Sequence, residues 1–152
     1  MHNLKKKIRR AHVMTRLEDI SQAQLQQELH QIEHRRRAEQ DQKAAYETEI
    51  ESLQQLLGRQ TRAGHSFDPA NYLQATRVIS DLEQHVHHHT AEIDTLDQQI
   101  QGLSEQLRQV SARKKTLQRL GERLHKEKHH QQTGAHYKQQ DETILHNYRG
   151  RL

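Results

Sequence analysis

The sequence predicts an all-α fold, a long two-helix antiparallel coiled-coil hairpin with unequal arms that forms one domain over residues 1–152. Three observations predict it: an apolar heptad repeat in the second half, a weaker repeat in the first half, and one sharp break near the centre. The composition agrees, because 31% hydrophobic and 3% aromatic residues can fill one narrow seam but not a multilayer core.

The first helix is predicted over about residues 3–57. Its heptad phase is apolar at its two ends and polar in the middle, where Arg36, Glu39 and Lys43 occupy it. The apolar members are Leu25, Leu29, Ile32, Tyr46, Ile50, Leu53 and Leu57. Before Leu25 the apolar residues no longer follow one phase. Leu4, Ile8 and Ala11 still fit it, but Val13, Leu17 and Ile20 follow a neighbouring stripe, so we expect a phase shift there.

The turn is predicted at about residues 58–68. Gly58 and Gly64 are both candidates for the left-handed residue that ends a helix. A short connection between two helices makes them antiparallel neighbours, so the break predicts a hairpin.

The second helix is predicted to begin at Pro69, the only proline, and to run to about residue 148. Asp68 has the character of an N-cap with Pro69 at the first helical position. Phe67 and Tyr72 have the spacing of a hydrophobic staple.

The repeat of the second helix is the strongest pattern in the sequence, and only His89, Lys114 and Gly121 interrupt it. Its members are Tyr72, Ala75, Ile79, Leu82, Val86, His89, Ile93, Leu96, Ile100, Leu103, Leu107, Val110, Lys114, Leu117, Gly121 and Leu124. Around the predicted turn, the numbers of paired residues should sum to about 130. This register places His89 across from Glu39 and Lys43, and it leaves everything after about residue 129 without a first-helix partner.

Metal binding and catalysis are not expected. Three histidine pairs have i, i+4 spacing (His30 with His34, His85 with His89, and His125 with His129), but cysteine is absent and the register does not bring the first two pairs together. There is no phosphate-binding Gly-rich loop, nucleophile elbow or metalloprotease pair. We therefore expect no cofactor and no enzymatic activity.

The N-terminal region is strongly basic, since no acid precedes Glu18 and the formal net charge is +4. Basic helices can bind nucleic acid, but no helix-turn-helix, zinc finger or aromatic RNA platform is visible, so a protein partner is the favoured reading. No apolar stretch follows the charged start, and no apolar run reaches membrane-spanning length. We expect neither a cleaved secretory signal nor membrane insertion.

Two segments resemble the FliJ/YscO central-stalk family of flagellar and virulence type III secretion systems. They are "NYLQATRVISDLEQH" at 71–85, similar to the family's segment after the turn, and "RKKTLQRLGERL" at 113–124, similar to its basic-then-leucine segment. The basic start and the hairpin pattern extend the resemblance over nearly the whole chain. One departure is Ala75, where the family segment can carry a bulky aromatic.

The resemblance implies a cytoplasmic protein, peripheral to the inner-membrane export apparatus, whose partners are a hexameric export ATPase, the cytoplasmic domain of an export-gate membrane protein, and secretion chaperones. It implies gate contacts near the turn, at Tyr72, Ala75, Ile79, Leu82, His85 and Val86. It implies that the paired termini enter the ATPase ring. The residues expected there are Leu4, Lys5, Lys6, Lys7, Ile8, Arg9, Arg10, Leu17, Arg119, Arg123, Tyr137, Ile144, Leu145 and Tyr148.

The function expected from these observations is a non-enzymatic stalk that couples the ATPase ring to the export gate and promotes protein secretion. Two alternatives remain open at the level of sequence. One is a generic coiled-coil adaptor or structural protein that dimerises into a four-helix bundle, and the other is a basic nucleic-acid-binding coiled coil.

Overall fold

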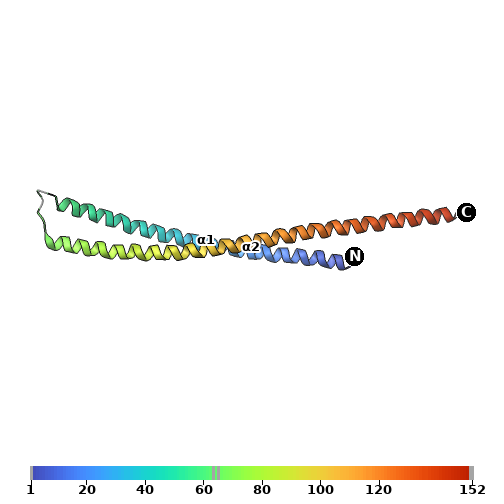
Figure 1. Ribbon diagram of the computed structural model, residues 1–152, viewed down its shortest axis with the longest axis horizontal. Helices are drawn as coiled ribbons and strands as arrows, with labels where there is room; N and C mark the ends of the chain where they lie inside the picture. Colours follow the sequence, from blue (N-terminus) through green and yellow to red (C-terminus); the bar gives the residue numbers. More distant parts are fainter. Residues whose placement is uncertain (1, 63, 65, 151–152) are drawn as a thin grey trace. The chain divides into compact units, whose positions relative to one another are not determined.

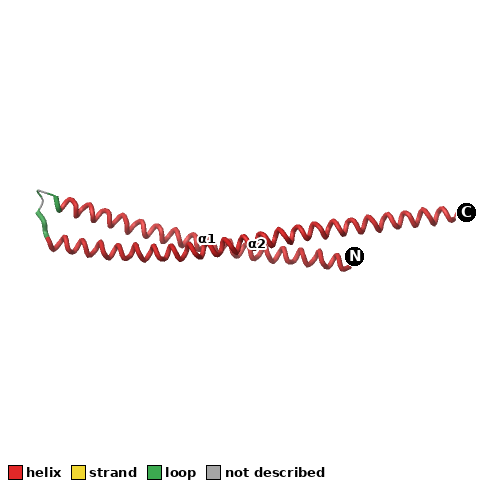
Figure 2. The backbone as a smooth tube through the Cα atoms, viewed as in Figure 1, coloured by secondary structure: helices red, strands yellow, loops and turns green. Residues whose placement is uncertain are grey.

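The computed structural model describes residues 2–62, 64 and 66–150, and it consists of two helices joined by a turn. Helix α1 spans His2–Gln60 and helix α2 spans Pro69–Gly150 (Figure 1). The described chain contains no strand, and its only non-helical part is the turn (Figure 2). The predicted all-α two-helix hairpin is confirmed, with helix bounds within three residues of those expected.

Each helix contributes to two compact units. The turn unit comprises Gln26–Glu105, and the terminal unit comprises the described parts of Met1–Leu25 and Gln106–Leu152. The two arms of each unit are therefore one segment of α1 and one segment of α2, held together by their own seam.

The start of α2 follows the predicted cap. The Asp68 carboxylate accepts a hydrogen bond from the Ala70 N–H at 3.0 Å, and the Asp68 carbonyl accepts one from the Tyr72 N–H at 3.1 Å. The rings of Phe67 and Tyr72 lie 5.6 Å apart, as a staple across the cap requires. The predicted N-cap, Pro69 start and staple are all confirmed.

The end of α1 differs from the prediction. Gly58 was a candidate for the helix-ending residue, but α1 continues through it to Gln60. The Thr61 hydroxyl donates to the carbonyls of Leu57 (3.1 Å) and Gly58 (3.2 Å), and the Thr61 N–H also donates to the Leu57 carbonyl at 3.1 Å, so Thr61 caps carbonyls of the last turn. Gly64 does adopt a positive φ of 96°, but it lies within the turn, beyond the helix end.

The α2 side of the seam is as predicted from Ala75 to Leu124, where every heptad position is buried or half-buried. Leu96 is the most enclosed side chain, at 2% exposed. Tyr72 is the exception, because it lies at the start of the helix and remains 39% exposed. Beyond the seam, the side chains from 134 to 150 are all exposed, which confirms that this part of α2 has no first-helix partner.

The predicted phase shift in α1 is wrong. Buried and half-buried positions keep one heptad phase before Leu25, at Leu4, Ile8, Ala11, Thr15, Glu18 and Gln22. The apolar stripe of Val13, Leu17 and Ile20 is instead exposed. The side of α1 that faces α2 is set by the regular repeat of α2, and polar side chains fill the seam where α1 offers no apolar ones.

Contacts between the helices confirm the register in both units. In the turn unit, Glu39 contacts His89 and Tyr46 stacks on His85. In the terminal unit, Glu18 contacts Arg113. The numbers of contacting residues on the two helices sum to between 128 and 136, around and slightly above the predicted value of about 130.

Truncation of the seam should cost far more than truncation of the outer face. We expect Leu96→Ala to lower the free energy of unfolding by about 2–5 kcal/mol, because it leaves a cavity at an enclosed position. Gln98→Ala, at an exposed position two residues further along, should change it by less than about 0.5 kcal/mol. Urea unfolding followed by circular dichroism measures both, and similar losses for the two variants would contradict this seam.

Candidate functional site

The core of the terminal unit contains two of the residues expected to contact the ATPase ring. Leu4 is buried in a cluster with Ala11 and Leu124, and Ile8 packs against this cluster. These side chains close the seam between α1 and α2, so an outside partner cannot reach Leu4 while the two helices remain paired.

The remaining residues of that expected set are on the outside of the terminal unit. Leu17 is 57% exposed, and the exposed cations come from both helices. They are Lys5, Lys6, Lys7, Arg9, Arg10, Arg119 and Arg123. The structure therefore brings the two predicted basic segments into one unit, with their charges facing solvent.

A groove of about 540 Å³ lies between these basic segments. The groove is not predicted from the sequence, because His12 on α1 and His125 and Lys128 on α2 have no expected binding role there. Its lining is Lys5, Ile8, Arg9, His12, His125 and Lys128, which includes no carboxylate. A surface of this kind favours acidic side chains on a partner.

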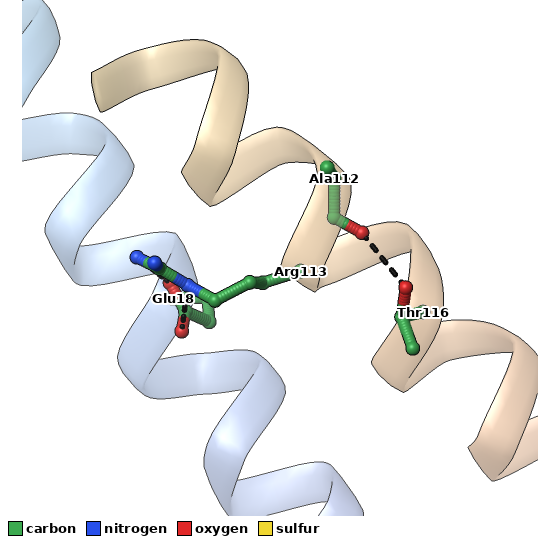
Figure 3. A network of polar contacts seen from close by, with 4 residues as sticks. All are labelled: Glu18, Ala112, Arg113 and Thr116. Carbon is green, nitrogen blue, oxygen red and sulfur yellow. Dashed lines mark hydrogen bonds and ion pairs between the residues drawn. The ribbon is translucent and has the colours of Figure 1, made fainter. Parts of the chain in front are cut away.

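Part of the expected basic charge is neutralised inside the unit. Arg113 donates two hydrogen bonds to the Glu18 carboxylate, at 3.0 and 3.4 Å (Figure 3). The ammonium of Lys114 lies 2.5 Å from an Asp19 carboxylate oxygen and donates to the Gln22 side-chain oxygen at 3.4 Å. Arg113 and Lys114 therefore serve the pairing of the helices, and the net positive charge lies nearer the α1 N-terminus.

The C-terminal extension, defined here as residues 130–150, carries the other residues expected at the ring. Its large apolar side chains are all more than half exposed. They are Tyr137, Ile144, Leu145 and Tyr148.

The residues expected to contact the export gate divide into two groups. Ile79 and Leu82 are buried in the seam of the turn unit, and Ala75 and Val86 are half-buried. These four side chains hold the two helices together, so they are not a free surface. Tyr72 and His85 are exposed, although the His85 ring stacks on Tyr46 at 5.0 Å.

Other apolar side chains next to the turn are exposed and were not predicted as contacts. They are Leu56, Phe67, Leu73 and Val78. Leu56, Leu73 and Val78 lie outside the heptad phase of their helices, and this departure is the sequence signal that identifies them. Together with Tyr72 they give the turn region an apolar surface.

A polar layer crosses the seam of the turn unit at His89, which is only 8% exposed. Its Nδ1 contacts the Glu39 carboxylate, as the register predicted, and its ring stacks on Tyr46 with 5.5 Å between centroids. Lys43, also expected here, forms its ion pair along α1 with Glu47, at 3.8 Å. The contribution of Tyr46, which stacks on both His85 and His89, was not foreseen.

Arg36 and Asp97 form a second ion pair across the same unit. The hydrogen bond and the charge of Asp97 raise the pKa of Arg36 above its ordinary value. Both side chains are well exposed, so this pair contributes little to the free energy of unfolding. Its main effect is to favour the alignment of the helices in which Arg36 and Asp97 meet.

The described residues contain no group of three or more His, Cys, Asp or Glu side chains arranged to hold a metal ion. The i, i+4 imidazoles of His85 and His89 are instead engaged by the Tyr46 ring. None of the described helices combines the length and the apolar character that crossing a membrane requires.

Comparison with known proteins gives no relative for this chain. No family model matches it, and neither does any curated protein or solved structure.

The His89–Glu39 layer should behave as a coupled unit. We expect Glu39→Leu and His89→Leu to destabilise the hairpin by about 1–3 kcal/mol each, because each leaves a polar partner in the seam without its hydrogen bond. The double variant should lose less than the sum of the two, since two leucines pack against each other. Urea unfolding of all four proteins measures this, and additive losses would show that the contact does not contribute.

Proposed function

We propose that this chain is a non-enzymatic central stalk of a type III secretion system, which couples a hexameric export ATPase to an export gate. In this role it is cytoplasmic and peripheral to the inner-membrane export apparatus. One end of the hairpin binds the ATPase ring, the turn region binds the cytoplasmic domain of the export-gate protein, and secretion chaperones bind along the chain.

The observation that carries the proposal is the combination of features in the terminal unit. A basic surface from both helices, including a groove without carboxylates, lies in the same unit as an apolar C-terminal extension that has no partner helix. A ring whose pore is acidic at its mouth and apolar inside would match both features. Charge of one sign accelerates the encounter, and the apolar side chains supply affinity as they leave water.

The paired seam supports this proposal because it makes the two-helix hairpin stiff. A stalk must transmit force or position between two partners, and it needs helices that keep one register. The paired side chains at Glu39–His89 and Glu18–Arg113 fix that register in the turn unit and in the terminal unit. Leu4, Ile79 and Leu82 act in the proposal as structural residues, because they are buried.

The proposed gate surface consists of the exposed side chains near the turn. Tyr72 is the member that the family resemblance implies and that solvent also reaches. Leu73 and Val78 extend this surface along α2. Ile79 and Leu82, which are buried in the seam, hold the helix that carries this surface in place.

Removal of residues 130–152 should leave a folded hairpin that binds a type III export ATPase at least tenfold more weakly. The hairpin remains because residues 134–150 contribute nothing to the seam. Pull-down and stimulation of ATP hydrolysis measure the binding, and circular dichroism checks folding. Full binding by the truncated chain would exclude insertion through this end.

Reversal of the basic charge near the N-terminus should also weaken ring binding, and more strongly at low salt. The variant is Lys5→Glu, Lys6→Glu and Lys7→Glu, and salt screens the interaction because all three side chains are exposed. A matched control makes the same charge change in the turn unit, at Arg59, Arg62 and Arg77. Equal losses in both triple variants would indicate a general charge effect. Co-purification of nucleic acid in place of the ring would favour the nucleic-acid alternative.

Gate binding should depend on Tyr72. We expect Tyr72→Ala to reduce secretion severalfold while the hairpin stays folded, whereas Arg77→Ala and Gln84→Ala, which are exposed but not apolar, should secrete normally. A secretion assay, with thermal unfolding of each variant alongside, distinguishes loss of contact from loss of stability. Normal secretion by a folded Tyr72→Ala chain would remove this residue from the proposed surface.

A further inference from the structure

Two apolar stripes of the terminal unit face solvent. The first, called here the outer stripe, lies on α1 at Val13, Leu17 and Ile20, with Met14 beside it. Its steps of four and three residues repeat those of a heptad, but the stripe lies on the side of α1 opposite Ala11, Thr15 and Glu18, which face the seam. The second stripe is formed by the apolar side chains of the C-terminal extension.

We propose that these stripes are two halves of one interface, in which the C-terminal extension of one copy of this chain packs on the outer stripe of a second copy. The second copy returns the same contact, so that a two-fold symmetric dimer forms. This inference does not rest on the proposed function, since it uses only the surfaces of the chain itself.

The two stripes of one chain cannot meet each other. The register places Val13 across from about residue 119 of α2. Ile144 lies about 25 residues further along the same helix, which is about 37 Å at 1.5 Å per residue. The extension continues away from the N-terminus of α1, so only another molecule can bring an outer stripe to it.

A two-fold axis near the α1 N-terminus satisfies both stripes at once. The extension of each copy then runs alongside α1 of the other, in the same N-to-C direction. In an isologous contact of this kind the same pair of surfaces is used twice, so the assembly closes at two copies. The second contact also forms within an already tethered pair, which strengthens the first.

One register aligns two apolar pairs and one pair of opposite charges. If Ile144 lies against Val13, the common step of four residues brings Tyr148 against Leu17. The common step of three residues in the other direction brings Asp141 beside Arg10. The two stripes therefore share the same residue spacing, as the two helices of a parallel coiled coil do.

Charge complementarity favours a second copy as the occupant. Asp141 lies on the apolar face of the extension, four residues after Tyr137 and three before Ile144. The outer stripe is flanked by Arg9, Arg10 and Arg16. The extension has two acids and two bases overall, so the complementarity is local: the acid within its apolar face matches the basic side chains beside the outer stripe.

Cysteine cross-linking tests the proposed register, because the chain has no cysteine of its own. A chain with only Val13→Cys is mixed with a chain with only Ile144→Cys and oxidised gently. We expect a disulfide-linked dimer in the mixture and little in either protein alone, since like positions lie far apart in the two-fold arrangement. Leu73→Cys, at an exposed apolar position in the turn unit, replaces Val13→Cys as the matched control and should not cross-link to Ile144→Cys.

Sedimentation equilibrium tests the energetics. We expect the unmodified chain to dimerise and Leu17→Glu or Ile144→Glu to weaken the dimer at least tenfold, with unchanged helicity because both positions are exposed. Leu73→Glu should leave the dimer unaffected. Arg10→Asp and Asp141→Arg should each weaken it severalfold, and the two changes combined in one chain should restore it.

Three results would overturn the proposal. They are a chain that stays monomeric at the highest concentration reached, a dimer that keeps its affinity in both glutamate variants, and cross-linking from Leu73→Cys equal to that from Val13→Cys. A charge exchange that fails to rescue the dimer would exclude the pairing of Asp141 with Arg10 and with it the stated register.

Discussion

The structure depends on a seam that is only one row of side chains deep on each helix. With so little buried surface, hydrophobic burial alone distinguishes poorly between neighbouring registers, because a shift by one heptad still places apolar side chains opposite apolar ones. The polar side chains in the seam remove this ambiguity. His89 finds Glu39 and Lys114 finds Asp19 in one alignment only, and a shifted alignment would leave them without partners.

The same pairs also determine where charge remains available. Glu18 and Asp19 are the first acids of the chain, and they are engaged by Arg113 and Lys114. The positive charge near the α1 N-terminus consequently has no acid on its own helix to offset it. In this way the acids of the α1 segment serve the pairing of the helices, and the basic side chains before them, with a groove whose lining has no carboxylate, face outside partners.

The exposed apolar side chains outside the seam form the candidate binding surfaces of the chain. Those near the turn belong to the turn unit, while the outer stripe and the C-terminal extension belong to the terminal unit. The ring proposal and the dimer proposal both use the extension, so they describe alternative occupants of one surface. A free chain would be dimeric in this view, and a ring that binds the extension more tightly would displace the second copy by mass action.

The sequence by itself determined the fold class, the turn, the cap at Asp68 and the register, because these follow from local patterns: heptad spacing, one proline and a capping residue. Only the tertiary structure decided which face of α1 is buried before Leu25, where the apolar residues Val13, Leu17 and Ile20 suggested a phase shift. It also decided that Leu4, Ile79 and Leu82, which the heptad phase places in the seam, are too buried to serve as partner contacts, and that Tyr46 joins the His89 layer. The physical reason is the same for each. A helix buries the face that its partner requires, and the side chains of the partner are not encoded in the local pattern of that helix.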